Sequence, residues 1–472
     1  MSELTRLREV PAPPAARLEA AAREARLRGR PVLLSTTREL PARTDPLAVV
    51  LASRRAGEPW FAFEQPERDR RALAGLGAAC ELRASGARRF SELAAAWEAL
   101  AAGAHADPPA DAPGAGLVAV GGAAFDGAGA GSPAWAGFDA ASLQVPTVCL
   151  ARRADRSWLT VNLLISPDDV PVERQAELER RLAELVHRPL PLLDPAPIGR
   201  HTVRSVMPPS HYEDAVARAV QRIRAGELSK VVLAREVEVL APGEPDPAAV
   251  LAVLREGFPG CFVYAVGRGE ATFLGASPEL LIRREGARAS TVALAGSTRR
   301  SADPAVDDHL GEQLLRSAKD RHENEIVARQ IERALAPHSV WVAAAPEPGL
   351  VQVANIQHLG RPIRAQLAQP LDAVTLAGLL HPTPAVGGAP WAVAAPLLPA
   401  LEGFDRGWYA GPVGWVDAAG DGEFCVALRC ALLRGRSARL FAGAGIVADS
   451  DPAAELAETE VKLQALLPVL SG

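Results

Sequence analysis

The chain has 472 residues, 48% of them hydrophobic, and a formal net charge of −5. This length suits two or three average domains, or one large α/β domain. The small net charge gives no support for nucleic acid or a membrane surface as a partner, and no apolar run approaches the roughly 20 residues of a membrane span. Five scattered cysteines, none in CxxC spacing, favour a reduced, cytoplasmic protein without a zinc cage.

The first 200 residues predict a mixture of helices and short strands. An Ala- and Arg-rich region ends at the breaker “ADPPADAPGAG” (106–116), and strand-like runs such as “SWLTVNLLI” (157–165) follow. A helix at 171–187 then leads into the Pro-rich connector “RPLPLLDPAPIGRH” (188–201). We expect this connector to divide a supporting part, residues 1–200, from a catalytic part, residues 201–472, within one intertwined domain.

Patterns in the second part are sharper. Ser210 and Glu213 have the spacing of a capping box, and a strand opens at Lys230. Further elements are predicted in this order: a hairpin and a strand over 261–285, one long helix over 309–336, late strands over 424–435 and 438–447, and a terminal helix over 450–470 that Ser450 or Asp451 can cap. Long helices with many strands predict an α/β or α+β fold with a large sheet.

Lysine is scarce in this chain: Lys230, Lys319 and Lys462 stand among 51 basic residues, and the others are arginine. Arginine stays protonated at any usable pH, whereas a buried lysine can lose its proton and act as a general base. Strand periodicity places Lys230 on one face with Val232 and Ala234, and these apolar neighbours would favour the neutral amine. A solvated lysine at a strand end is the alternative interpretation.

Carboxyl groups in three segments are candidates for acid catalysis or metal binding. Glu279 follows a strand and a proline-marked turn in “GASPELL”, where an apolar site would make it a proton donor; a surface glutamate is the alternative. Two helices carry acidic residues at one-turn spacing, Asp320 with Glu323 and Glu455 with Glu458. Oxygen-only ligands of this kind suit Mg²⁺, and solvated helix faces with Glu–Lys pairs are the alternative.

Three more segments indicate a pocket for a small anion. The backbone N–H groups of “FAGAGIV” (441–447) could cradle a carboxylate or phosphate, although the segment lacks a nucleotide-binding fingerprint. “HPTPAVGG” (381–388) combines proline-fixed turns with small residues such as Ala385, which is typical of a tight pocket wall. Arg429, expected on a strand amid apolar residues, needs an anionic partner such as a substrate carboxylate.

Nine motifs of the chain stand in the order of a known family. They are “KVVLAR”, “GASPELL”, “LAGSTRR”, “LLRSAKDRHEN”, “NIQHLGRPI”, “LHPTPAVGG”, “FDRGWYAGPVGW”, “FCVALRCALL” and “AGAGIVADSDPAAELAETEVK”. Together they resemble the chorismate-utilising enzymes, and within them the isochorismate synthases. The resemblance is dense over residues 205–470 and looser over the first 200.

The resemblance implies a fold, a cofactor and residue roles. The family fold is α/β, a large single-domain sandwich of two β-sheets packed between helices, with the active site in a cleft. Lys230 would be the base that activates water for attack at C2 of chorismate, and Glu279 the acid that protonates the departing C4 hydroxyl. Mg²⁺ would be held by Glu323 and Glu458, with support from Glu455. The substrate would contact a further set: Gly296, Ser297, His358, Ala385, Tyr409, Arg429, Gly443, Gly445 and Lys462.

Single positions separate the members of this family. Anthranilate synthase typically has glutamine at the position of Lys230 and a glutaminase partner, which is not expected here. Aminodeoxychorismate synthase has a nucleophilic lysine where this chain has Ala295, and salicylate synthase tends to have threonine at the position of Ala385. The pattern favours an isomerase that stops at isochorismate. It leaves open whether the product feeds menaquinone, siderophore or salicylate synthesis, and a monomer or weak homo-oligomer is expected. Salicylate synthase and a non-catalytic chorismate-binding protein stay open as alternatives.

Overall fold

Alternate side chains of single strands enter two different cores. In the computed structural model, which describes residues 12–40, 44–108, 112–129, 131–193 and 199–471, Phe61 and Phe63 of strand β2 (Gly57–Gln65) join one apolar cluster, whereas Trp60 and Ala62 join another. Successive residues of a strand point to opposite faces of its sheet. The first cluster also takes residues from a second sheet, and the other takes residues from helices, so both faces of this sheet are covered.

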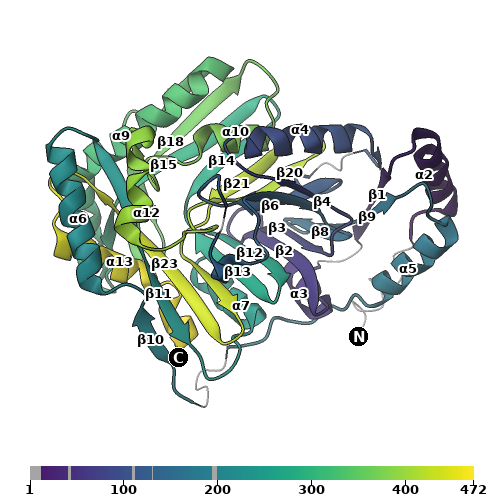
Figure 1. Ribbon diagram of the computed structural model, residues 1–472, viewed down its shortest axis with the longest axis horizontal. Helices are drawn as coiled ribbons and strands as arrows, with labels where there is room; N and C mark the ends of the chain where they lie inside the picture. Colours follow the sequence, from purple (N-terminus) through teal and green to yellow (C-terminus); the bar gives the residue numbers. More distant parts are fainter. Residues whose placement is uncertain (1–11, 41–43, 109–111, 130, 194–198, 472) are drawn as a thin grey trace.

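Two sheets extend through the described parts of the chain (Figure 1). The larger has thirteen strands there, in the order β10 (Thr202–Ser205), β11 (Lys230–Leu240), β23 (Ser437–Ile446), β22 (Cys430–Arg434), β13 (Ala271–Ser277), β12 (Phe262–Gly269), β2, β3 (Arg71–Leu76), β8 (Val148–Arg153), β9 (Arg156–Ile165), β1 (Val32–Leu40) and β5 (His105–Ala106), with β19 (Gly388–Ala389) beside β11. The smaller has ten, in the order β16 (Ser339–Ala344), β18 (Ile356–Leu367), β15 (Arg288–Arg299), β14 (Leu280–Glu285), β21 (Gly422–Val426), β20 (Pro412–Asp417), β6 (Val118–Ala123), β7 (Ala141–Val145) and β4 (Cys80–Ala84), with β17 (Gly349–Gln352) beside β18.

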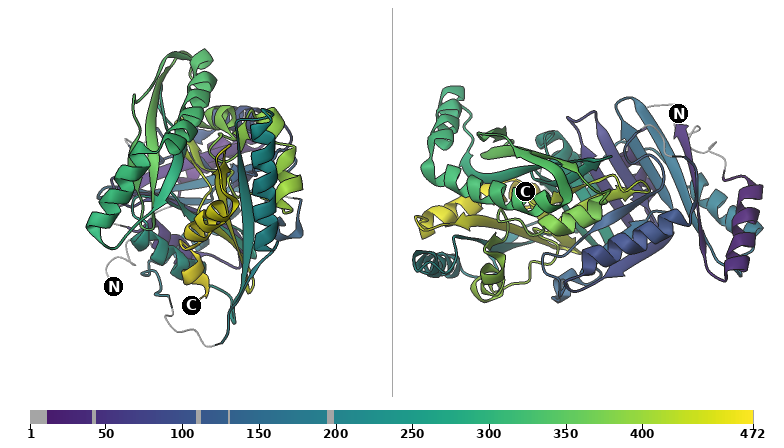
Figure 2. Two further views of the ribbon diagram at one scale, coloured as in Figure 1. Left: turned by 90° about the vertical axis from the view of Figure 1, so that its left-hand side faces the viewer. Right: turned by 90° about the horizontal axis from the view of Figure 1, so that it is seen from above.

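Helices pack around the two sheets (Figures 1 and 2). They are α2 (Ala15–Arg28), α3 (Pro46–Ser53), α4 (Arg89–Ala102), α5 (Pro171–Ala183), α6 (Pro209–Arg224), α7 (Pro247–Gly257), α8 (Pro304–Arg316), α9 (Ala318–Leu335), α10 (Ala373–Leu380), α11 (Trp391–Ala394), α12 (Leu397–Glu402), α13 (Pro452–Leu463) and α14 (Leu467–Ser471). This arrangement confirms the predicted α/β sandwich of two sheets between helices. No helix in the described ranges is long and apolar enough to cross a membrane.

Strands from both parts of the chain are neighbours in each sheet. β12 pairs with β2 in the larger sheet, and β20 pairs with β6 in the smaller. The purple and blue N-terminal strands therefore continue the layers formed by the green and yellow C-terminal strands (Figures 1 and 2). Residues 194–198 of the predicted connector lie outside the described residues, and the division into a supporting and a catalytic part stays a prediction.

Three helix predictions are wrong at their boundaries. Helix α6 begins at Pro209 and no side chain caps it, so Ser210 does not form the predicted capping box; a proline at the first turn presets the helical φ. The single helix expected over 309–336 is two helices, because the backbone of Ser317 is extended and its hydroxyl accepts a hydrogen bond from the N–H of Asp320. The terminal helix expected over 450–470 is likewise two helices, α13 and α14; α13 is capped by Asp451, one of the two residues expected.

The chain changes sheets at two adjacent crossovers. β13 of the larger sheet leads into β14 of the smaller, and β21 of the smaller leads into β22 of the larger. Hydrogen bonds join the crossovers: the Ser277 hydroxyl donates to the Val426 carbonyl at 2.5 Å, and the Ala276 N–H donates to the Arg429 carbonyl at 3.1 Å. Arg429 therefore lies between two strands, not on one as predicted, and its φ of 47° is uncommon for a side-chain-bearing residue. Glu279 occupies the other crossover, so the fold places these two charged groups at the same junction.

Candidate active site

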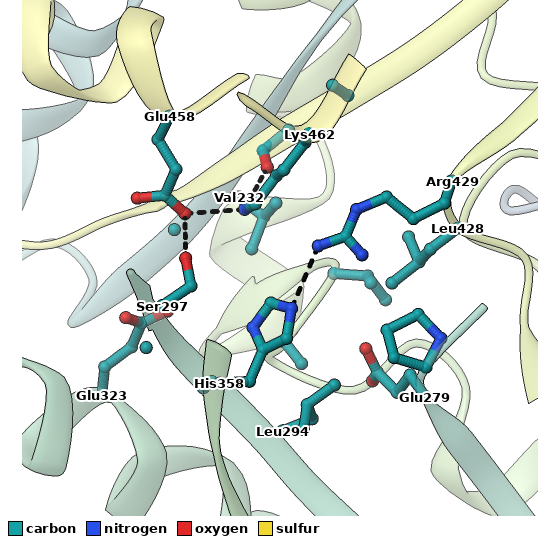
Figure 3. Close-up of a pocket in the computed structure, with 18 of the residues that line it drawn as sticks. Val232, Glu279, Leu294, Ser297, Glu323, His358, Leu428, Arg429, Glu458 and Lys462 are labelled. Atoms are coloured by element: carbon teal, nitrogen blue, oxygen red, sulfur yellow. Dashed lines mark hydrogen bonds and ion pairs between the residues drawn. The ribbon is translucent and has the colours of Figure 1, made fainter. Parts of the chain in front are cut away.

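A pocket with an empty volume of about 650 Å³ lies where the crossovers meet β11, β15, β18 and β23. The predicted site residues that line it are Glu279, Gly296, Ser297, Glu323, His358, Ala385, Tyr409, Arg429, Gly443, Gly445, Glu458 and Lys462. Lys230 and Glu455 do not line it, and each is ion-paired to another side chain instead. The structure thus brings together residues that are up to about half the chain apart (Figure 3).

Lys230 is fully buried at the start of β11, so the alternative interpretation of a solvated lysine at a strand end is wrong. Its Nζ lies 2.7 Å from Oε1 of Glu323, on α9. Among the described residues the amine has no hydrogen-bond partner besides this ion pair. Because Glu323 lines the pocket and Lys230 does not, the carboxylate stands between the amine and the pocket.

Glu458 is held as a carboxylate by two neighbours. Nζ of Lys462, four residues later on α13, lies 2.7 Å from Oε1 of Glu458, and the Ser297 hydroxyl donates to the same oxygen at 2.8 Å (Figure 3). Burial by itself would raise the pKa of Glu458, but Lys462 and the hydrogen bonds outweigh it, so the pKa lies below its ordinary value. Lys462 also donates to the Gly443 carbonyl at 2.8 Å, which ties α13 to β23.

Glu279 has the opposite protonation. The side chain is buried, and burial raises the pKa of its carboxyl from 4.5 to about 8, although the positive charges of Lys230, Arg429 and Lys462 act in the other direction. No ion pair involving Glu279 occurs among the described residues. A carboxyl with this pKa keeps its proton at neutral pH and can donate it into the pocket.

Arg429 and His358 form a buried polar pair beside Glu279. The guanidinium donates to Nε2 of His358 at 3.0 Å (Figure 3). Since arginine has no acceptor, Nε2 must be the unprotonated nitrogen of a neutral imidazole; burial first, and then Arg429, hold the pKa of His358 well below its ordinary value. No carboxylate pairs with Arg429 within the described ranges, and an anionic partner for its guanidinium, such as a substrate carboxylate, stays a prediction.

Two glycines of β23 allow close approach at the pocket wall. A Cβ on Gly445 would stand 2.3 Å from Oε1 of Glu323, and a Cβ on Gly443 would stand 3.1 Å from the hydroxyl oxygen of Tyr409. The Tyr409 ring stacks on Phe441, with centroids 5.3 Å apart. Small residues are needed here because the Glu323 carboxylate at Gly445, and the Leu233 carbonyl oxygen (2.9 Å) with the Tyr409 hydroxyl at Gly443, crowd the space that a Cβ would fill.

The family model for chorismate binding enzymes matches residues 18–471. The chain belongs to this family. The match includes most of the first 200 residues, where the motifs resemble the family only loosely.

Named relatives agree with this membership of the chorismate binding enzyme family. The chain is 38% identical over 455 residues to the “Salicylate biosynthesis isochorismate synthase” of Pseudomonas aeruginosa, covering 96% of this chain and 93% of the relative. It is 32% identical to “Isochorismate synthase MenF” of Bacillus subtilis, covering 93% and 94%. The solved structure of MenF, the menaquinone-specific isochorismate synthase from Escherichia coli, matches with a TM-score of 0.77 at 27% identity, covering 96% of this chain and 99% of that one.

The carboxylates of this family member suit a hard cation. In the described residues no group of three or more His, Cys, Asp or Glu side chains is arranged to hold a metal alone. Glu323 and Glu458, however, face one pocket from α9 and α13, and their present partners are lysine ammonium groups. Mg²⁺ takes one or two carboxylates and completes its shell with water or substrate oxygens, so this donor set fits magnesium.

Some residues were misjudged or missed from sequence. Asp320 bonds to Ser317 at the start of α9 and does not line the pocket. The lining residues without a predicted role are Val232, Pro278, Leu294, Ala295, Val386, Leu428, Phe441 and Ala442. Nearly all lie inside the family motifs quoted above, so the motif positions were the signal that could have found them.

Proposed function

We propose that this protein is an isochorismate synthase, an isomerase that converts chorismate to isochorismate with Mg²⁺. One observation carries the proposal. A single pocket has a protonated carboxyl, Glu279, on one side, and a buried lysine, Lys230, lies behind Glu323 on the other side. Moving a hydroxyl from C4 to C2 of the ring requires an acid and a base at different positions. The relatives that cover nearly the whole chain are named isochorismate synthases, which supports the same reaction.

The base would be Lys230. Its Nζ takes a proton from water, and the water oxygen forms the new bond at C2 as the ring double bond shifts. The ion pair with Glu323 covers the amine, so we expect Glu323 to turn away before water reaches Nζ.

The acid would be Glu279. It gives its proton to the C4 oxygen, the C4–O bond breaks, and the hydroxyl leaves as water. The net reaction consumes one water at C2 and releases one at C4, and the proton that Lys230 gains returns to Glu279 through solvent, so atoms and charge balance. Because burial keeps Glu279 protonated at neutral pH, the proton is in place before substrate arrives.

An arginine, hydrogen-bonding groups and the metal ion would bind the two carboxylates of chorismate. Arg429, Tyr409 and the backbone of Gly443 and Gly445 surround the space that we assign to the pyruvyl carboxylate. Glu323 and Glu458 would hold Mg²⁺ near the ring carboxylate, and the bound ion would stabilise negative charge there as electrons shift through the ring. We further propose that the protein acts in the cytoplasm and without a glutaminase subunit.

A salicylate synthase is the second candidate. The name of one relative refers to salicylate biosynthesis, although that name still describes an isochorismate synthase. Salicylate synthases resemble this chain but tend to have threonine at the position of Ala385, which lines the pocket here. The absence of that hydroxyl favours release of isochorismate with its pyruvyl group intact.

Incubation of the purified protein with chorismate and MgCl₂, followed by chromatography, separates these candidates. Isochorismate without pyruvate is the expected result. Pyruvate with salicylate would identify the lyase. Chorismate bound but unchanged would refute the enzymatic proposal.

A further inference from the structure

One of the three lysines has no place in the proposed chemistry. Nζ of Lys319, in the first turn of α9, lies 3.0 Å from Oε1 of Glu455 in the first turn of α13. The Lys319 side chain is 38% exposed, whereas that of Glu455 is 3% exposed. A cation that reaches solvent therefore neutralises a carboxylate that does not.

This pair stands next to the proposed metal-binding carboxylates. Lys319 precedes Glu323 by four residues on α9, and Glu455 precedes Glu458 by three on α13, so each partner is one helical turn from a proposed ligand. With Lys230 at Glu323 and Lys462 at Glu458, all three lysines of the chain end on these three carboxylates.

The charge of Lys319 has a larger effect on a bound ion than its ion pair has on the packing of the two helices. Helix α9 packs on β15 and β18 of the smaller sheet, and α13 packs on β23 of the larger sheet and on α6. Each helix is thus held by its own neighbours, and a partly exposed ion pair adds little to that packing. Its electrostatic field, by contrast, acts on any ion bound one turn away.

We propose that Lys319 sets the affinity of the pocket for its two charged ligands, the divalent cation and the dianionic substrate. The positive charge of Lys319 offsets the negative charge of Glu455. Binding of the cation is therefore weaker, and binding of the anion stronger, than with Glu455 alone. The part that concerns the substrate rests on the proposed function, and the part that concerns the cation does not.

The test is Lys319→Met, with Lys319→Gln as a second variant that also has an uncharged side chain at this position. Titration calorimetry with MgCl₂ in the absence of substrate, and the rise of Tm with MgCl₂, measure cation affinity without turnover. Removing one charge near a divalent ion should tighten Mg²⁺ binding about tenfold in both variants, and the KM for chorismate should rise about fivefold.

Two matched controls separate charge from structure. Lys319→Arg keeps the charge and should leave both affinities within about twofold of wild type. Arg329→Met removes a cation from the same helix that pairs with Glu325 and is mostly exposed, and it should change neither affinity. In the double variant Lys319→Met, Glu455→Gln, the Mg²⁺ affinity should return toward the wild-type value, because both charges of the pair are gone.

Opposite shifts of the two affinities are the signature of this role. If Lys319→Met and Lys319→Gln bind Mg²⁺ equally or more weakly than wild type, the proposal is overturned, since a merely structural role weakens both ligands. If Mg²⁺ binds more tightly but the wild type makes no isochorismate, the charge role of Lys319 stands and the proposed function fails.

Discussion

Glu279 and Glu458 face the same pocket, yet the structure gives them opposite protonation: the side chain of Glu279 is buried, whereas that of Glu458 is 30% exposed. Glu458 has an ammonium group at 2.7 Å and a hydroxyl donor at 2.8 Å, and its pKa is lowered. Glu279 has only more distant positive charges, and its pKa is raised to about 8. Burial raises the pKa of a carboxyl that has no charged neighbour, and a cation at contact distance reverses that shift.

The two sides of the pocket differ in the same way. Around Glu458 the carboxylates and lysines form ion pairs, which suits binding of a cation and of a charged group of the substrate. Around Glu279 lie a neutral imidazole and a guanidinium that no carboxylate of the described residues pairs with, which suits proton delivery and anion binding. Each of the following experiments tests one of these two sides.

Glu279→Gln should have the largest effect. The amide has the size of the protonated acid but no proton to donate, so kcat should fall about 10³-fold, while Tm stays nearly unchanged because a neutral group replaces a neutral group. Steady-state kinetics and thermal unfolding measure this. Glu458→Gln is the matched control: it should weaken Mg²⁺ binding instead. A kcat within tenfold of wild type for Glu279→Gln would remove Glu279 from the acid role.

Lys230→Arg tests the base opposite this acid. Arginine keeps the positive charge beside Glu323 but does not lose its proton at neutral pH, so kcat should fall about 10²-fold or more. Chorismate binding, measured by calorimetry, should change little. Near-wild-type turnover in this variant would show that the buried amine is not the base.

The pH profile should report the raised pKa directly. The acid must be protonated to act, so kcat/KM should fall about tenfold per pH unit above pH 8. The raised pKa of Glu279 also makes stability depend on pH. Because the pKa is higher in the folded state, the contribution of Glu279 to the free energy of unfolding is fully present below pH 4.5 and is lost as the pH rises toward 8. Glu279→Gln should show a smaller loss of Tm over that window, and an identical profile in both proteins would contradict the assignment.

Ser297→Ala should have the smallest effect. It removes one hydrogen bond to Glu458 and leaves Lys462 in place, so Mg²⁺ affinity should fall about fivefold, equivalent to about 1 kcal/mol. Calorimetry with MgCl₂ measures the change. No loss of affinity would mean that Lys462 alone holds the carboxylate, and a loss beyond a hundredfold would mean that the hydroxyl itself contacts the ion.

The sequence predicted the participants of the pocket better than their backbone setting. The strand that opens at Lys230 and a terminal helix capped by Ser450 or Asp451 were both predicted, and Asp451 is the cap; the burial of Lys230 was left open and only the structure decided it. The break at Ser317 and the crossover at Arg429 were missed, because both elements continue their apolar pattern across the break. Local periodicity does not distinguish one strand from two that belong to different sheets.

By itself, the sequence determined which side chains are available and which elements carry them: residue type, motif order and periodicity are local properties of the chain. Only the tertiary structure decided how each carboxyl is protonated and what each lysine contacts. Those outcomes depend on distances between residues that are far apart in sequence, such as Lys230 to Glu323 and Lys319 to Glu455. Electrostatic energy and desolvation depend on separation and burial, and both are set when the two sheets close around the pocket.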